Sequence, residues 1–166
     1  MTGITFEEIM FTIMSATQDT FKNYLGVDIY AGKVEKKVDP VDSDVVGIVG
    51  VAGDRVGYII LGADSGAAVT IARQLLMLDE PDGESIRDAI GELTNNIAGV
   101  FKTRYHEQYG SVALGLPLVV SGSIRTLGEG EPDPAATSSM NVQCKGVTIP
   151  FRSLDGTFSL RVMVYM

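Results

Sequence analysis

The sequence predicts an α+β fold in which duplicated helix-strand-hairpin units form one antiparallel-rich sheet, with the helices packed on one face. Two long stretches carry apolar residues at every third or fourth position, which is typical of amphipathic helices. Other stretches, rich in β-branched residues, flank short turns that contain Gly and Asp, which is typical of hairpins. The order helix, strand, hairpin occurs twice, so the chain resembles a duplicated unit. The two units are residues 5–61 and 84–165.

In the first unit, Thr5 and Glu8 have the spacing of a capping box, so a helix is expected to begin after Thr5. Gly26 is expected to end this helix, because glycine adopts the left-handed conformation found beyond helix C-termini. A strand is expected next, followed by a hairpin whose turn is Gly53–Asp54. These strands are predicted at residues 27–34, 45–51 and 56–61.

The remaining elements follow from caps and breakers. Asp64 and Ser65 are expected to cap a helix over 66–78, and Pro81 with the Gly that follows Asp82 separates it from a longer helix over 84–105. The second unit then contains one or two strands, an exposed loop rich in Gly and Pro, and two closing strands. These segments are predicted at 111–124, 128–138, 141–150 and 158–165.

Composition excludes several classes of protein. A chain of 166 residues with 45% hydrophobic and 20% charged residues fits one globular domain, residues 1–166. A net charge of −8 disfavours nucleic-acid binding, and no run of 18 apolar residues is present for a membrane span. Glu7 and Glu8 lie where a signal peptide would need positive charge, and the single Cys144 excludes an internal disulfide framework. We therefore expect a cytoplasmic protein.

The helix predicted over 84–105 has an unusual polar face. At about 100° per residue, four residues opposite the apolar stripe fall within roughly 60° of one another. They are Asp88, Glu92, Asn95 and Gly99. A glycine inside a helix costs about 1 kcal/mol relative to alanine. Its missing side chain would let another molecule approach the carboxylate and the amide closely.

The pattern D-x3-E-x2-N made by Asp88, Glu92 and Asn95, followed by Pro117 22 positions after Asn95, resembles the signature of the CheC/CheX/FliY family of chemotaxis phosphatases. The apolar-backed helix and the strand containing GLPLVVSG resemble that family too, most clearly over 45–120. A single motif makes the chain most similar to the CheX-like branch. E-x-x-N alone is a common helical sequence, so the spacing to Asp88 and Pro117 is what makes the resemblance specific.

The resemblance implies a phosphatase that hydrolyses the aspartyl phosphate of a CheY-like response regulator. Asn95 would orient the attacking water and Glu92 would dock a lysine of the partner, while Asp88, Gly99 and Pro117 would support the site. No cofactor or metal is implied in this chain, because the regulator would supply Mg²⁺. The resemblance also implies a homodimer formed through strand contacts, for which residues 141–165 are the candidate.

The chemistry of the two side chains agrees with this role. A neutral amide cannot act as a base, but it can both donate to and accept from a water and so fix its direction. Phosphoryl transfer depends mainly on such positioning and on charge stabilisation. An exposed Glu92 would be a weak general base at neutral pH.

Other candidate residues give weaker hypotheses. His106 is the only histidine and has no cluster of metal-ligating neighbours in sequence, so a surface or structural role is favoured. Cys144 lacks a partner histidine at motif spacing, and Asn96 points about 100° away from Asn95, which favours a cap or packing role. No G-x-G-x-x-G or P-loop indicates nucleotide binding.

Two alternatives to the enzyme remain open. One is a non-catalytic interaction module of the chemotaxis or flagellar-switch type on the same fold, and the other is a small-ligand sensor domain. The intact pair Glu92 and Asn95 favours the enzyme. The first helix has no such pair, because Met10 and Phe11 follow Glu7 and Glu8 at the third position, so at most one site is expected.

Overall fold

Two β-hairpins form the centre of the computed structural model, which describes residues 5–36, 41–124 and 146–166. The hairpins join edge to edge, because β3 pairs with β7 over six positions from Tyr58↔Tyr165 to Ala63↔Leu160. In the first, β2 (Val41–Gly53) pairs with β3 (Gly57–Ala63); in the second, β6 (Gly146–Ser153) pairs with β7 (Ser159–Tyr165).

Three further strands extend the sheet at its two ends, and each pairs with the hairpin of the other unit. From the first unit, β1 (Ile29–Ala31) pairs with β6. From the second, β4 (Val112–Leu114) and β5 (Leu118–Ile124) pair with β2. The order is β1-β6-β7-β3-β2-β4, with β5 also on β2, and every pairing is antiparallel. The predicted fold class is confirmed, and the two units are joined by exchange of their short strands.

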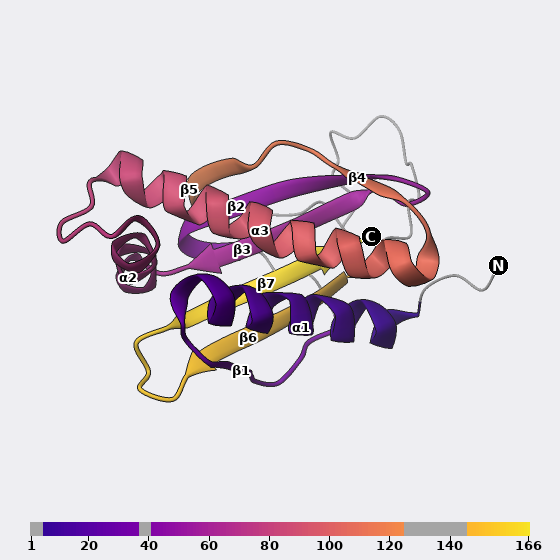
Figure 1. The fold of residues 1–166 in the computed structure, drawn as a ribbon, viewed down its shortest axis with the longest axis horizontal. Helices are drawn as coiled ribbons and strands as arrows, with labels where there is room; N and C mark the ends of the chain where they lie inside the picture. Colours follow the sequence, from indigo (N-terminus) through magenta and orange to yellow (C-terminus); the bar gives the residue numbers. More distant parts are fainter. Residues whose placement is uncertain (1–4, 37–40, 125–145) are drawn as a thin grey trace, which may run out of the picture.

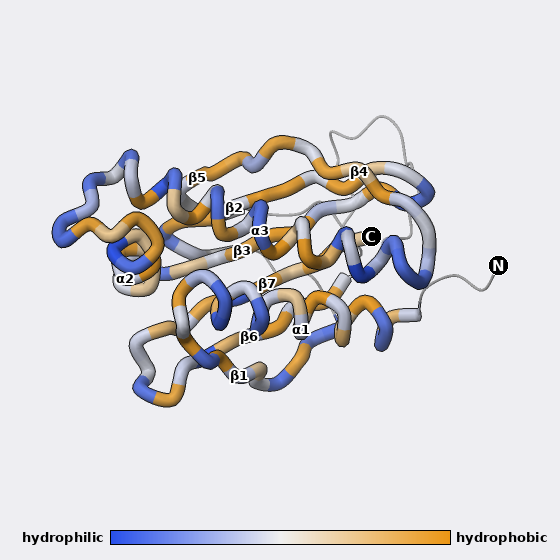
Figure 2. Tube along the Cα trace, viewed as in Figure 1, coloured by the Kyte–Doolittle hydropathy of each residue, from blue (hydrophilic) through white to orange (hydrophobic). Residues whose placement is uncertain are grey.

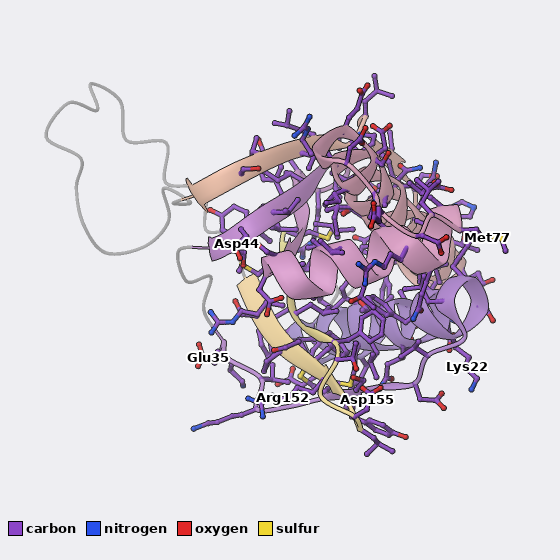
Figure 3. The ribbon with its side chains drawn as sticks, turned by 90° about the vertical axis from the view of Figure 1, so that its left-hand side faces the viewer. Lys22, Glu35, Asp44, Met77, Arg152 and Asp155 are labelled. Carbon is purple, nitrogen blue, oxygen red and sulfur yellow. The ribbon has the colours of Figure 1, made fainter. Side chains whose placement is uncertain are left out.

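The helices cover one face of this sheet. They are α1 (Phe6–Leu25), α2 (Ser65–Leu76) and α3 (Gly83–Tyr109). Figure 1 shows α1 and α3 running antiparallel across the face, with α2 viewed almost end-on beside the start of α3. The side view in Figure 3 separates the two layers and places Met77, at the end of α2, on the helix side. The predicted packing of helices on one face is therefore confirmed.

The helix boundaries follow the predicted caps. The hydroxyl of Thr5 accepts from the amide of Glu8 and the Glu8 carboxylate accepts from the amide of Thr5, which is a complete capping box. Gly26 ends α1 in the left-handed region at φ 65°. Asp64 caps α2 by accepting from the amide of Ala67 at 2.7 Å.

Some boundaries differ from the predictions. The longest helix continues to Tyr109, four residues beyond the predicted end, because Tyr105 and Tyr109 still pack against buried residues. The first strand is shorter than predicted and covers only Ile29–Ala31. The predicted loop at 128–138 and residues 141–145 of the next predicted strand lie outside the described residues.

The core lies between the helices and the sheet. In Figure 2 the central strands are mainly hydrophobic in colour, while α1 and α3 alternate between hydrophilic and hydrophobic along their length. The largest side chains with less than 2% exposure come from all three helices and from strands β3 and β6. They include Phe21, Phe101, Phe151, Ile9, Ile13, Ile59, Leu61, Ile90, Leu93 and Ile97. None of the helices in the described ranges is long and apolar enough to cross a membrane.

The predicted dimer edge at 141–165 is not available along β7. Strand β7 pairs with β3 on one side and β6 on the other, so it has no free edge to offer a second chain. Strand β6 is partly covered by β1 through the pairs from Ile29↔Ser153 to Ala31↔Phe151. The homodimer itself stays a prediction.

Helix α3 sits unusually close to β2. A Cβ added at Gly47 would lie 2.1 Å from the hydroxyl oxygen of Thr94 and 3.3 Å from Cγ2 of Ile90. The Thr94 hydroxyl is already held, because it donates to the carbonyl of Ile90 at 2.6 Å. Gly47 is therefore required for the distance between this helix and the sheet.

We expect Gly47→Ala to lower the free energy of unfolding by about 2 kcal/mol or more, because overpacking forces backbone shifts in a dense core. The control is Gly66→Ala on α2, where an added Cβ meets only the Asp64 carboxylate oxygen at 3.5 Å. Helix propensity predicts that this change stabilises by up to about 1 kcal/mol. Urea denaturation of both variants measures the difference, and equal stability would contradict the close-packing argument.

Candidate functional site

The motif residues lie on the outer surface of α3. Asp88, Glu92 and Asn95 are exposed, and Gly99 is half-buried. Their neighbours on the opposite side of the helix, Ile90, Leu93 and Ile97, are fully buried against the sheet and the other helices. The structure thus places the carboxylate and the amide one turn apart on a helix that the core holds rigidly, as the apolar stripe predicts.

The side chains of Glu92 and Asn95 are free to contact another molecule. Within the described residues, neither side chain makes a hydrogen bond or an ion pair with the rest of the chain. A Cβ added at Gly99, one turn beyond Asn95, would meet nothing within 4 Å. The surface above this part of α3 is therefore open.

Pro117 lies beside the first half of the motif, although it comes from the connection between β4 and β5. Gly91 allows α3 and this connection to approach closely, because a Cβ added at Gly91 would lie 3.1 Å from Cγ2 of Val119 and 4.0 Å from Cβ of Pro117. Gly91 is buried and immediately precedes Glu92. Sequence reasoning missed Gly91, although a second glycine inside the same helix was a signal for another close approach.

Asn96 differs in part from its expected role. It is half-buried, which agrees with packing rather than catalysis, but its Nδ2 is buried and has no hydrogen-bond partner among the described residues.

His106 is exposed near the end of α3, where its Nδ1 lies 3.2 Å from the Ser111 hydroxyl. The described residues contain no cluster of metal-ligating side chains, and Cys144 lies outside them.

The N-terminus of α3 is fixed by Asp82. The carboxylate accepts from the amide of Ser85 at 2.8 Å, in the geometry of an N-cap. This backbone hydrogen bond, followed by the contribution of the Ser85 hydroxyl, lowers the pKa of Asp82 below its ordinary value. The charged cap therefore holds the start of the helix, about two to four turns before Asp88, Glu92 and Asn95.

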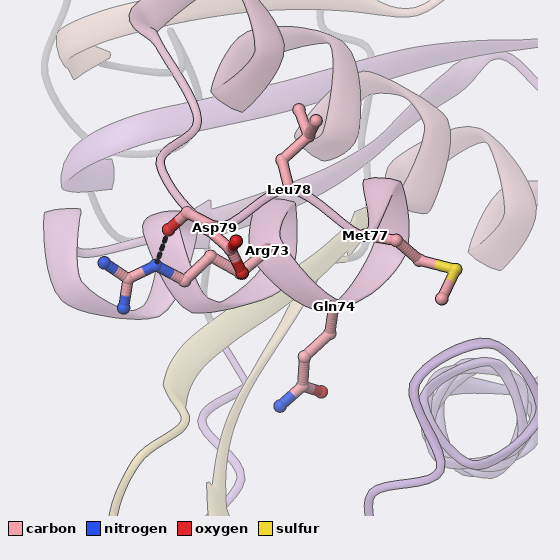
Figure 4. Close-up of a pocket in the computed structure, with 5 residues that line it drawn as sticks. All are labelled: Arg73, Gln74, Met77, Leu78 and Asp79. Carbon is pink, nitrogen blue, oxygen red and sulfur yellow. Dashed lines mark hydrogen bonds between the residues drawn. The ribbon is translucent and has the colours of Figure 1, made fainter.

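Two hollows on the surface lie away from the motif. One, of about 530 Å³, lies at the C-terminal end of α2. Figure 4 shows the side chains of Gln74, Met77 and Leu78 pointing in three different directions, while Arg73 Nε donates to the carbonyl of Asp79 at 3.0 Å. No set of polar groups converges there, so this hollow is not a candidate catalytic site.

The second hollow, of about 410 Å³, lies between α1 and the C-terminal half of α3. Arg104 crosses between the helices, where it donates to the Ser15 hydroxyl and pairs with Asp19. Phe11 lines the hollow and is 62% exposed. The Glu8 carboxylate is occupied by its hydrogen bonds to Thr5 and Tyr109, which lower its pKa.

The helix α1, which lines this second hollow, can be compared with α3. When α1 and α3 are aligned on their terminal glycines, Gly26 and Gly110, their buried faces coincide. The buried residues Ile9, Ile13, Thr17 and Phe21 then match Leu93, Ile97, Phe101 and Tyr105.

In the same alignment Glu8 matches Glu92, while Phe11 stands where α3 has Asn95. A phenyl ring cannot donate to or accept from a water as an amide does. The α1 face therefore lacks the group that would orient a water, and the expectation of at most one site stays a prediction.

Comparison with known proteins identifies the family. A family model described as chemotaxis phosphatase CheX matches residues 45–152. The chain belongs to this family. The resemblance predicted from Asp88, Glu92, Asn95 and Pro117 is thereby confirmed at the level of the family. No curated protein sequence matched the chain.

Solved structures share the fold. The chemotaxis protein CheX from Desulfovibrio desulfuricans has a TM-score of 0.77 and 22% identity, with 96% of this chain and 99% of that chain covered. A CheC-like protein from Shewanella sp. PV-4 has a TM-score of 0.77, 20% identity and 98% coverage of both chains. CheX in a CheX-CheY-BeF3-Mg²⁺ complex from Borrelia burgdorferi has a TM-score of 0.70 and 22% identity, with 95% and 96% coverage.

The charge on Asp82 predicts how stability depends on pH. Because its pKa is lowered in the folded chain, its contribution is present above the ordinary pKa of an aspartate and is lost as the pH falls below about 4. We expect wild type to be more stable than Asp82→Asn near neutral pH and the difference to shrink at about pH 3.

The test is urea denaturation of both proteins at the two pH values. Asp79→Asn is the control, because Asp79 lies in the exposed connection before α3 and does not cap a helix. A difference between wild type and Asp82→Asn that is the same at both pH values would show that the charge of the cap is not what stabilises α3.

Proposed function

We propose that this CheX-family chain hydrolyses the aspartyl phosphate of a CheY-like response regulator. Asn95 orients the attacking water, and Glu92 docks a lysine of the regulator. The observation that carries the proposal is an exposed carboxylate and an exposed amide, one turn apart and without partners within the described residues, on a helix anchored in the core.

The reaction needs little from this chain beyond position. The water oxygen forms a bond to phosphorus while the bond from phosphorus to the aspartate oxygen breaks, which releases inorganic phosphate and the free carboxylate. The amide of Asn95 accepts one hydrogen of the water and can donate to a neighbouring oxygen, so it fixes the direction of attack. Glu92 forms a charge-assisted contact with the lysine, which orients the regulator on α3.

The other expected site residues support this arrangement. Asp88 lies one turn before Glu92 and adds negative charge facing the regulator's lysine. Pro117 limits the conformations of the segment that packs on Gly91, because its ring fixes φ. The regulator supplies Mg²⁺ in this proposal, and the solved CheX-CheY complex named above contains Mg²⁺ and BeF3.

A homodimer is the second part of the proposal. Strand β5 pairs with β2, and within the described residues no strand covers its other edge. Exposed edges favour pairing with another chain. We therefore propose that the β5 edge, in place of residues 141–165, is where two copies would meet.

Asn95→Ala should fold and still bind the phosphorylated regulator, but it should lose about 10²-fold or more of the rate acceleration, because the water is no longer oriented. Asn95→Asp should also be poor, since a carboxylate cannot donate and repels the phosphoryl group. The measurement is loss of phosphate from a panel of phosphorylated receiver domains, with a thermal melt of each variant.

Glu92→Ala should instead raise KM or Kd, with a cost of about 1–3 kcal/mol if the contact is desolvated in the complex. Gln108→Ala and Glu107→Ala remove an exposed amide and an exposed acid from the last turn of the same helix and serve as matched controls. An Asn95→Ala protein with an unchanged melt and full activity would leave only the interaction-module alternative.

The open surface at Gly99 gives a separate prediction. Gly99→Leu should slow dephosphorylation, because the added side chain occupies space that the regulator must approach. Leucine is a better helix former than glycine by about 0.8 kcal/mol, so the variant should melt at the same or a higher temperature. Gly66→Leu on α2 is the matched control, and full activity of Gly99→Leu would show that the regulator does not pass over this position.

A further inference from the structure

We propose that Leu116 is an apolar docking residue for the response regulator, placed beside the acidic motif face to give the complex affinity. This inference rests on the proposed function. It adds that the regulator would present an apolar surface next to the lysine that meets Glu92. Leu116 is not part of the sequence motif, so the motif alone does not predict this contact.

The first observation is the exposure of the side chain. Leu116 is 92% exposed, which is the highest value among the large hydrophobic residues of the described chain. Single exposed hydrophobic residues are common on protein surfaces and alone mean little. The position of this leucine is what distinguishes it.

The second observation is that the backbone around Leu116 is held on both sides. The amide of Gly115 donates to the carbonyl of Gly50 at 2.8 Å. Pro117 packs against Gly91 on α3, and β5 then pairs with β2 from Leu118↔Ile48 onward. A leucine on such a fixed segment loses little backbone freedom on binding, so more of its burial appears as affinity.

The third observation is its distance from the motif. Pro117 Cβ lies 4.0 Å from the Cβ position of Gly91, which is one helical turn from Asn95. Chain geometry then places Leu116 within roughly 15 Å of Asn95. A standard protein interface covers about 800 Å² on each partner, a patch about 30 Å across. A regulator centred on Glu92 and Asn95 would therefore cover Leu116.

The charge pattern supports the regulator as the occupant. Pro117, which follows Leu116, approaches Gly91, and the exposed acids Glu92 and Asp88 lie next to Gly91 and three residues before it on the same helix. Charged contacts at an interface mainly set orientation and association rate, whereas buried apolar residues supply much of the affinity. The two kinds of contact on adjacent elements fit one partner that has a cation beside an apolar surface.

The test compares Leu116→Asp and Leu116→Ala with Leu154→Asp. Leu154 is 87% exposed and lies in the turn between β6 and β7, at the opposite side of the sheet from β5. Figure 1 shows this turn far from α3, and Figure 3 labels the neighbouring Asp155 at the lower edge. KM and kcat are measured with a phosphorylated receiver, Kd with the same receiver activated by BeF3 and Mg²⁺, and association state by sedimentation.

We expect Leu116→Asp to raise KM and Kd by about 10-fold or more and to leave kcat at saturation unchanged. Leu116→Ala should have a smaller effect in the same direction, and Leu154→Asp should match wild type. The melts of all three should be unchanged, since both leucines are exposed.

Three outcomes would overturn the inference. If Leu116→Asp binds as wild type while Glu92→Ala binds weakly, the proposed function stands and the leucine contact is wrong. If Leu116→Asp leaves KM unchanged but converts a dimer to a monomer, Leu116 serves contact with a second copy. If wild type neither binds nor dephosphorylates any receiver in the panel, the proposed function and the inference fail together.

Discussion

The close packing of α3 on β2 is the constraint on which the candidate site depends. Gly47 leaves room for Thr94, whose hydroxyl turns back onto the helix, so backbone and helix approach without an intervening side chain. The same helix approaches the β4–β5 connection through Gly91. These two glycine contacts fix the rotation of α3 about its axis, and that rotation decides which residues face solvent. Glu92 and Asn95 are exposed because Leu93 and Ile97 are locked inward.

The duplicated architecture provides two helices whose buried positions align, but only α3 carries the amide of Asn95 at the exposed position that Phe11 occupies in α1. Strand β1 of the first unit pairs with β6 of the second, and β4 of the second unit pairs with β2 of the first. The backbone hydrogen bonds that follow β1 and β4 are also alike. Gly32 donates its amide to the carbonyl of Pro150 at 2.7 Å, as Gly115 does to Gly50 at 2.8 Å. With the backbones equivalent, the difference between the faces lies in the side chains. Phe11 in place of the amide, and a Glu8 already used in the helix cap, make the α1 face unsuited to orienting water.

Local signals in the sequence were sufficient to predict most of the helices and strands. The capping box at Thr5, the cap at Asp64 and the apolar stripe of α3 each depend on residues within one or two helical turns, so patterns of three to seven residues reveal them. The exchange of β1 and β4 between the units depends on contacts far apart in sequence and could not be read from such patterns. The same limit applies to the site. The face of α3 was predictable from periodicity, whereas the contact of Pro117 with Gly91 and the exposed position of Leu116 required the tertiary structure.

A helix suits the proposed chemistry better than a loop because it fixes a distance as well as a direction. Residues three or four apart on a helix have Cβ atoms about 5–6 Å from each other. If Glu92 holds a lysine and Asn95 holds a water, the regulator must present its lysine and its phosphoryl group at a matching separation. A partner with a different separation would lose one of the two contacts, so the helix itself selects among receivers. The proposed apolar contact at Leu116 would add affinity from a separate element, so the choice among receivers would still depend on the spacing of Glu92 and Asn95 on α3.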